Sequence, residues 1–296
     1  MTAKQSEILF LWDGENWNPN GDILNENAPR YDEVASKALV SDVRIKRTIR
    51  DYLDRNGYEI FVKEVECEGG GVVDGKTRVE QLVGGNAKDK DVVNLLIERC
   101  IDVRAFGGVF PVEKKSFNLT GPVQFKMSKS VNDAEIVFVK GTGAFASEKC
   151  KENKTFREEY ILPYALFATY GVSSEYLAQK SRLSEEDMEA VLRGLWRGTK
   201  NLISRSKFGQ LPRFLLRVVY KEPGEYIGAL DKLIDLVTDK VNTAEIRSID
   251  EYSIDISRLA DKLEANRDKI ERVEYMHDEE LKIAPIPEWW QRVEAL

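Results

Sequence analysis

The sequence predicts an α+β fold, on two observations. Strand-like and helix-like segments alternate along the chain, but they lack the long, regular spacing of parallel βαβ units. The chain has 296 residues with 42% apolar and 32% charged content, which suffices for one large domain, or one compact domain with elaborations. No internal repeat or low-complexity linker interrupts it. The longest apolar runs are too short to cross a bilayer, so we expect a cytoplasmic protein without membrane contact.

The N-terminal segment is predicted to hold a buried strand, a long loop and a helix. Residues 7–12 form an almost continuous apolar run, and residues 13–35 are polar and rich in turn formers. The helix begins at Ser41, which suits an N-cap, and Gly57 ends it. At helical spacing, one face is apolar and a neighbouring face is basic. The apolar face holds Ile45, Ile49, Tyr52 and Leu53, and the basic face holds Lys46, Arg47 and Arg50.

The middle of the chain is predicted to contain an excursion and a hairpin. Residues 58–99 carry two glycine clusters and a charged helical stretch at 91–99. Residues 116–131 alternate as a strand around a break at 120–122. Strands at 135–140 and 160–170 are joined by a long polar connection. Such a pair predicts a protruding hairpin.

The C-terminal part is predicted to alternate helices and strands. Ser184 opens a capping-box pattern before an amphipathic helix, and a loop at 204–210 leads into a strand at 214–220. We then expect a helix at 227–241, a strand at 246–252, a helix at 256–269 and a strand at 270–276. The paired tryptophans of the tail at 285–290 are expected to pack it down.

The residue inventory argues against ordinary catalytic and metal sites. Cys67, Cys100 and Cys150 lie far apart, which fits neither a disulfide framework nor a zinc site and suits a reducing compartment. His277 is the single histidine. Residues 16–21 have the rhythm of a calcium loop but lack its leading Asp and final Glu, so an Asx-turn loop is favoured. There is no phosphate-binding loop and no nucleophile elbow. The sequence therefore predicts no catalytic residue, metal or cofactor.

Charge is segregated along the chain. The net charge of −7 is unfavourable for nucleic acid, but residues 191–221 contain cations and no Asp or Glu, and a second basic group lies at 44–50. Segregated charge gives an acidic protein one attractive face for a polyanion. The loop at 204–210 adds hydroxyls and Phe208, a composition suited to RNA backbone contact. For one basic run alone, a solvated face balanced by nearby acids is the favoured interpretation, and for the loop at 204–210 alone the two interpretations are equal.

Six motifs occur in order along most of the chain. They lie at residues 18–22 (N-P-N-G-D), 29–32 (P-R-Y-D), 41–50 (S-D-V-R-I-K-R-T-I-R), 102–108 (D-V-R-A-F-G-G), 119–125 (L-T-G-P-V-Q-F) and 160–166 (Y-I-L-P-Y-A-L). Together they resemble the repeating backbone subunit of the type I CRISPR Cascade complex, the "Cas seven" superfamily, in its Csd/Csh branch and preferably type I-B.

The resemblance implies a modified RRM-like (ferredoxin-like) palm with a finger excursion and a thumb hairpin. The palm would comprise 1–57, 100–135 and 160–221, the fingers 58–99 and the thumb 136–159, with an α/β extension at 222–296 packed on the palm. Many copies would bind one CRISPR guide RNA head to tail and present it to target DNA. Other implied partners are the handle-capping subunit, the large subunit and the processing endoribonuclease.

The predicted RNA-binding residues combine the basic segments with the family motifs. They are Arg44, Lys46, Arg47, Arg50, Gln124, Lys126, Lys129, Arg205, Lys207 and Phe208. Phe145 is the candidate thumb residue that displaces bases.

Two other functions remain open from the sequence. One is a metal-dependent RNase on the same scaffold, because related type III backbones cut RNA with a loop aspartate and Asp22 and Asp32 fall in that loop. The type I branch does not cut. The other is a free-standing, ligand-binding regulator without an RNA partner.

Overall fold

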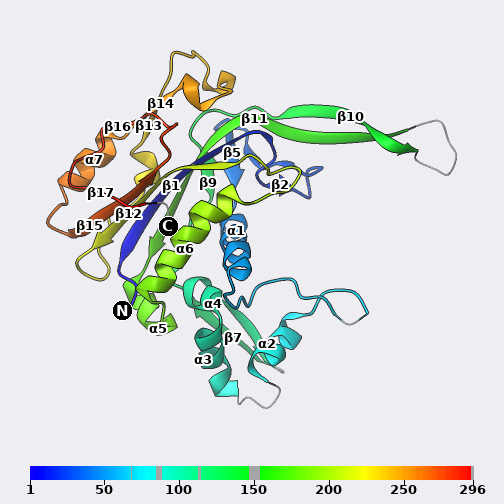
Figure 1. Ribbon diagram of the computed structural model, residues 1–296, viewed down its shortest axis with the longest axis vertical. Helices are drawn as coiled ribbons and strands as arrows, with labels where there is room; N and C mark the ends of the chain where they lie inside the picture. Colours follow the sequence, from blue (N-terminus) through cyan, green and yellow to red (C-terminus); the bar gives the residue numbers. More distant parts are fainter. Residues whose placement is uncertain (68, 85–88, 113–114, 147–153, 295–296) are drawn as a thin grey trace.

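A computed structural model describes residues 1–296 except 68, 85–88, 113–114, 147–153 and 295–296. The predicted α+β class is confirmed, because a large sheet carries helices on its faces (Figure 1). In the described part, this sheet is ten-stranded, with the path β17-β15-β12-β1-β11-β9-β5-β4 and with β8 and β10 paired to β11. Its strands are β1 (Ser6–Trp17), β4 (Tyr31–Asp32), β5 (Lys37–Val40), β8 (Val123–Phe125), β9 (Ser128–Ser130), β10 (Val137–Ala146), β11 (Lys154–Ser173), β12 (Leu211–Tyr220), β15 (Ile270–His277) and β17 (Gln291–Arg292).

Strand β1 is central and buried on both faces. It pairs antiparallel with β11 and β12, so that Leu9 lies opposite both Tyr170 and Leu216. Alternate side chains enter two different cores, as the two-residue period of a strand requires. The predicted strand is confirmed, but it continues to Trp17, so the loop expected from residue 13 is wrong there. Asp13 can lie inside the fold because Arg213 pairs with its carboxylate at 2.8 Å.

Short strands replace much of the remaining predicted loop. β2 (Gly21–Asp22) pairs with β3 (Ala28–Pro29), and β4 pairs with β5. The turn between β2 and β3 is closed by Asn27 N–H, which donates to the Asp22 carbonyl at 2.8 Å. Glu26 and Asn27 both have positive φ, which a tight turn requires. Asn18, just after β1, donates its Nδ2 to the Asn27 carbonyl at 2.7 Å, which attaches this turn to the end of β1.

Two helices cover one face of the sheet, α1 (Asp42–Arg55) and α6 (Glu185–Lys200). The predicted apolar face of α1 is confirmed by the burial of Ile45, Ile49 and Leu53. α6 carries the predicted capping box and packs closely on α1 at Gly194, where an added Cβ would lie 2.9 Å from Ile49 Cγ2. The Ser41 hydroxyl makes no cap hydrogen bond within the helix. It donates instead to Asn20 Oδ1 at 2.9 Å, which ties α1 to the preceding loop.

The C-terminal part covers the opposite face. It contains η1 (Leu230–Lys232), β13 (Asp235–Val237), η2 (Thr243–Glu245), η3 (Ile249–Glu251), β14 (Ser253–Asp255), α7 (Ser257–Glu264) and β16 (Ile283–Ala284), followed by β17. The predicted strand at 270–276 is confirmed as β15, and the predicted helix at 256–269 ends early, at Glu264. Trp290 is buried, which agrees with the expectation that the tryptophans pack the tail against the rest of the protein.

The predicted helix at 227–241 and strand at 246–252 are wrong. The backbone N–H groups of Ile227 and Gly228 donate to the buried carboxylate of Glu7, each at 2.8 Å. These bonds, with the left-handed conformation of Ala229, fix an irregular path where the apolar spacing alone favoured a helix. The segment still buries Leu230 and Ile234 against the sheet.

A separate small core holds the predicted excursion. It is formed by α2 (Gly75–Val83), α3 (Asp89–Arg99), α4 (Ile101–Phe106) and the hairpin of β6 (Gly107–Val112) and β7 (Lys115–Thr120). The buried cluster runs from Phe61 to Phe110 and so extends past the expected boundary at residue 99. Arg50 of α1 joins this body to the main one through Asp102.

The predicted hairpin is present as β10 and β11. Their register runs from Val137 opposite Ile161 to Ala146 opposite Lys154, and the hairpin projects from the sheet (Figure 1). The second half of β11 lies in the central sheet beside β1. One continuous strand therefore links the projection to the core. None of the helices in the described ranges is long and apolar enough to cross a membrane.

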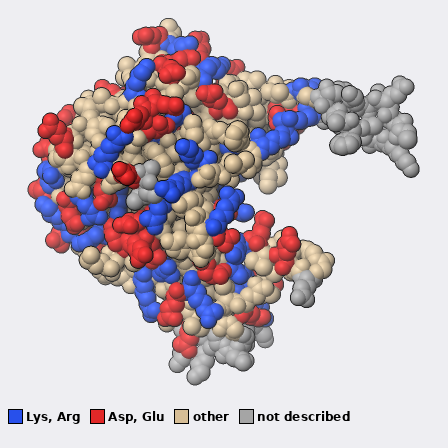
Figure 2. Space-filling model, in the orientation of Figure 1, with Lys and Arg blue, Asp and Glu red and all other residues tan. Residues whose placement is uncertain are grey.

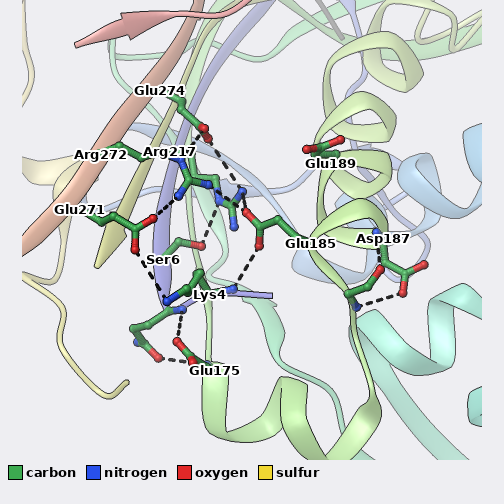
Figure 3. A network of polar contacts seen from close by, with 12 residues as sticks. Lys4, Ser6, Glu175, Glu185, Asp187, Glu189, Arg217, Glu271, Arg272 and Glu274 are labelled. Carbon is green, nitrogen blue, oxygen red and sulfur yellow. Dashed lines mark hydrogen bonds and ion pairs between the residues drawn. The ribbon is translucent and has the colours of Figure 1, made fainter. Parts of the chain in front are cut away.

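A buried ion-pair network joins β12 to α6 (Figure 3). Arg217 Nη1 donates to Glu185 Oε1 at 2.6 Å, and Arg272 Nη2 reaches the same oxygen at 3.0 Å. Burial raises the pKa of Glu185, but the hydrogen bond and charge of Arg217, with the Lys4 N–H, hold this pKa below its usual range. Arg213 and Arg217, both in the basic run at 191–221, are thus internal, so that run is not one continuous surface.

Candidate nucleic-acid interface

The end of β1, the start of α1 and the loop after α6 meet at one place. The N–H of Asn18 donates to the carbonyl of Ser206 at 2.8 Å, which attaches the loop to the first strand. Arg44 lies between them: its Nε donates to the Pro19 carbonyl at 3.1 Å and its Nη2 to Gln210 Oε1 at 2.7 Å. Loop and helix residues that are far apart in the sequence therefore form one surface.

Arg44 and Lys207 are two cations of this surface that bond no carboxylate among the described residues. The hydrogen-bond acceptors of Arg44 are all neutral, and Lys207 Nζ bonds the Ser206 hydroxyl at 3.2 Å. Burial lowers the pKa of Arg44 to about 10, partly opposed by the more distant Asp51. Burial, and then the charge of Arg44, lowers the pKa of Lys207. An anion bound here would relieve this repulsion and would meet two preoriented donors.

The other predicted cations of α1 are paired with acids. Lys46 Nζ lies 3.1 Å from Asp42 and donates to Gln124 Oε1 at 2.7 Å, so two predicted residues are in contact. Arg47 pairs with Asp51 at 2.6 Å on the exposed side of the helix.

Arg50 pairs with a buried carboxylate. Its Nε donates at 2.9 Å to the buried carboxylate of Asp102, which also accepts the N–H groups of Phe61 and Val62. Arg50 therefore supports the junction between the two bodies of the molecule.

The remaining predicted cations are distributed over the sheet edge and the hairpin base. Lys126 pairs with Asp231 at 2.9 Å and lies over the Tyr170 ring, and Lys129 pairs with Asp32 at 3.5 Å. Arg205 pairs with Glu159 of β11. Phe208, in the same loop as Arg205, is 68% exposed. The side chain of Phe145 lies outside the described residues.

Comparisons with known proteins identify the family. A family model described as "CRISPR-associated protein Cas7" matches residues 4–257. A "CRISPR-associated protein Cas7" from Haloferax volcanii is 30% identical, over 95% of this chain and 89% of that protein. This chain belongs to the Cas7 family. The resemblance seen in the sequence motifs is thereby confirmed, and type I-B stays a prediction.

Solved structures support the Cas7 fold. A chain of a "CRISPR RNA-guided surveillance complex, pre-nicking" matches with a TM-score of 0.59 at 13% identity, covering 98% of this chain and 96% of that one. A chain of a "CRISPR RNA-guided surveillance complex" matches with a TM-score of 0.54 at 14% identity, covering 98% and 94%.

The aspartates considered for a Cas7-type nuclease are held in local contacts. Asp22 accepts the Leu24 N–H and lies 3.5 Å from Arg30, and Asp32 pairs with Lys129. Across the described ranges, no group of three or more His, Cys, Asp or Glu residues is arranged to hold a metal ion.

Two residues of this region could not be identified from the sequence pattern. Gln210 accepts a hydrogen bond from Arg44 and donates one to the Thr199 carbonyl at 2.8 Å. It lies at the end of a loop whose cations alone suggested RNA contact, and a neutral amide adds nothing to that pattern. Arg157, at the hairpin base, is followed by Glu158 and Glu159, and so it carried no basic pattern. Figure 2 shows the surface hollowed between the hairpin and the α2–β7 body, with Lys and Arg along the hairpin base.

Proposed function

We propose that this chain is the guide-RNA-binding backbone subunit of a type I CRISPR interference complex. It polymerises along the guide RNA, contacts other Cascade subunits and presents the guide to target DNA. Membership of the Cas7 family supports this role, and the place of Arg44 between the end of β1 and the loop after α6 is the observation that carries it. In the described part of the chain Arg44 and Lys207 bond neutral acceptors, and an RNA phosphate would supply the anionic partner.

The palm of this subunit is proposed to be RRM-like. The order of elements β1, α1, β8 and β9, β11, α6, β12, with the sheet order β12-β1-β11-β9 and all these pairs antiparallel, supports the ferredoxin-like connection. On this assignment, residues 136–159, which include β10 and the start of β11, are the thumb, and residues 58–99 are the fingers. The α1–α6 face then bears the basic surface.

Assembly on RNA is expected to grow with the length of the RNA. A head-to-tail contact does not close, so each added stretch of guide admits another copy. Sedimentation of the protein with guide RNAs of increasing length should show a mass that rises in regular steps. A dimer of constant mass at every RNA length would contradict the assignment, and the RNA-free protein is the control.

The subunit is proposed to be non-catalytic. Complementary RNA annealed to the bound guide should remain intact with magnesium or manganese, because Asp22 and Asp32 are engaged in turn and ion-pair contacts. Gel electrophoresis of labelled RNA measures this. Divalent-dependent cleavage that Asp32→Ala or Asp22→Ala abolishes would instead establish the RNase alternative.

A further inference from the structure

Gln210 is a buried amide that connects Arg44 to the end of α6. It is 1% exposed and directly precedes β12. Its Nε2 donates to the Thr199 carbonyl at 2.8 Å, and its Oε1 accepts from Arg44 Nη2 at 2.7 Å. The Thr199 carbonyl is one of the last four of α6, which lack a partner inside the helix. Because a carbonyl only accepts and a guanidinium only donates, one orientation of the amide satisfies both contacts.

Gln210 completes a set of neutral contacts around Arg44. The Nε of Arg44 donates to the Pro19 carbonyl at 3.1 Å, and its Nη1 donates to the Thr48 hydroxyl. Its guanidinium carbon also lies 5.4 Å from the centroid of the Trp12 ring. These contacts come from the end of β1, from α1 itself and from the loop before β12. They hold the guanidinium from several sides, and none of them brings a negative charge to it.

Arg213 shows the contrasting arrangement. It is also buried, but the carboxylates of Asp13, Asp278 and Glu280 bond it. Burial lowers the pKa of Arg213, yet the charge of Asp13 and the bonds to the three carboxylates raise it above its usual value. At Arg44 the effect of burial prevails, and the pKa falls to about 10. Arg44 is therefore still charged at neutral pH, but its charge is compensated much less than that of Arg213.

The charge of Arg44 acts on the loop after α6. Burial, and then the charge of Arg44, lowers the pKa of Lys207 in that loop. Because the acceptors of Arg44 are dipoles and not ions, its positive potential extends to the loop, where a polyanion would meet it. A carboxylate at position 210 would also bond Arg44, but it would cancel that potential. A neutral amide fixes the guanidinium and leaves its charge in place.

We propose that Gln210 is a positioning residue that holds Arg44 without neutralising it, so that the charge of Arg44 remains available to the RNA backbone. Gln210 itself is too deeply buried to contact the RNA, and it acts through Arg44. The inference rests on the proposed RNA-binding function. It adds to that function a reason why the residue beside this cation is an amide and not an acid.

Gln210→Glu tests the effect of charge. The carboxylate would neutralise Arg44 from inside the fold, without occupying the place of a phosphate. We expect RNA affinity to fall about tenfold, the effect of losing one charge-assisted hydrogen bond. In a filter-binding salt series, the slope should be smaller by about one unit. Gln179→Glu, on the exposed surface of α5, is the matched control, because it changes the net charge equally and should leave both quantities unchanged.

Gln210→Met tests the effect of position. Methionine has a similar length and no charge, but it cannot bond the guanidinium. The salt slope should be retained, because both cations keep their charge, and RNA affinity should fall several-fold, because Arg44 must be ordered when the RNA binds. In an Arg44→Met background, Gln210→Met should cause no further loss. A purely structural role, in which Gln210 only orders the loop, would weaken RNA binding equally in both backgrounds.

The outcomes separate this inference from the proposed function. The melting temperature of each RNA-free variant shows whether it folds. If Gln210→Glu does not fold, the comparison of Gln210→Met in the two backgrounds decides, and an equal loss in both overturns the inference. A folded Gln210→Glu protein with normal RNA affinity and salt slope also overturns it. If Lys207→Glu loses RNA while both Gln210 variants bind normally, RNA binding stands and the role of Gln210 falls. If the unsubstituted protein binds no RNA, the proposed function itself fails.

Discussion

Lys207→Glu is expected to weaken RNA binding about 10- to 100-fold, the effect of losing a charge-assisted hydrogen bond. The substitution puts a carboxylate beside Arg44, where it would take the place proposed for an RNA phosphate. A salt series by filter binding should show a slope smaller by about one unit for each phosphate that the variant no longer neutralises. The loss of affinity should be similar for RNAs of different sequence, because phosphate contacts carry no base information.

Lys262→Glu is the matched control for this experiment. Lys262 is exposed on α7, on the opposite face of the sheet, and the substitution changes the net charge equally. Equal RNA affinity of the two variants at every salt concentration would place the RNA elsewhere.

A pH series gives an independent check on Lys207. Its lowered pKa means that it loses its proton at a lower pH than an ordinary lysine, so RNA affinity should fall in that window. Lys207→Arg should move this fall to higher pH. The sign for stability is opposite: the RNA-free fold binds its proton less well than the unfolded chain, so this group favours folding more as pH rises through the lowered pKa.

Arg50→Ala is expected to destabilise the RNA-free protein by about 3 kcal/mol, because it leaves a buried carboxylate without its cation. The Asp102 side chain is 0% exposed, and its remaining hydrogen bonds within the described ranges come from the N–H groups of Phe61 and Val62. The midpoint of urea unfolding measures the loss. The expected loss of about 3 kcal/mol is at the low end of the range for breaking a buried ion pair, because Asp102 keeps its bonds to the two N–H groups.

Arg47→Ala is the comparison for Arg50. Arg47 pairs with Asp51 at the exposed surface of the same helix, and such pairs contribute at most about 1 kcal/mol. Arg50→Ala/Asp102→Asn should recover part of the lost stability, since the uncompensated charge is gone. If Arg50→Ala weakened RNA binding and left the unfolding midpoint unchanged, Arg50 would be an RNA contact, as the sequence motif suggested, and not a support of the junction.

Much of the fold follows from local pattern. The apolar face of α1 and the capping box of α6 depend on residues three and four positions apart, so they are visible in the sequence. The strands β1 and β15 were likewise predicted from their apolar runs. The segment at 227–241 was not, because its backbone hydrogen bonds go to Glu7, more than two hundred residues earlier.

The candidate site also combines features that the sequence shows with features that only the tertiary structure shows. The sequence by itself determined the family motifs, the α+β class and which segments are rich in cations. Only the tertiary structure decided which partners from distant parts of the chain these cations meet. Lys46 and Arg50 look alike on the helix and both side chains are largely buried, yet Lys46 reaches the amide of Gln124 and Arg50 the buried carboxylate of Asp102. Lys207 acquires its lowered pKa from burial and from Arg44, a neighbour 163 positions away by residue number. The residue type determines whether a side chain can carry a charge. The free energy of that charged form depends on burial and on partners that the fold brings from distant parts of the chain.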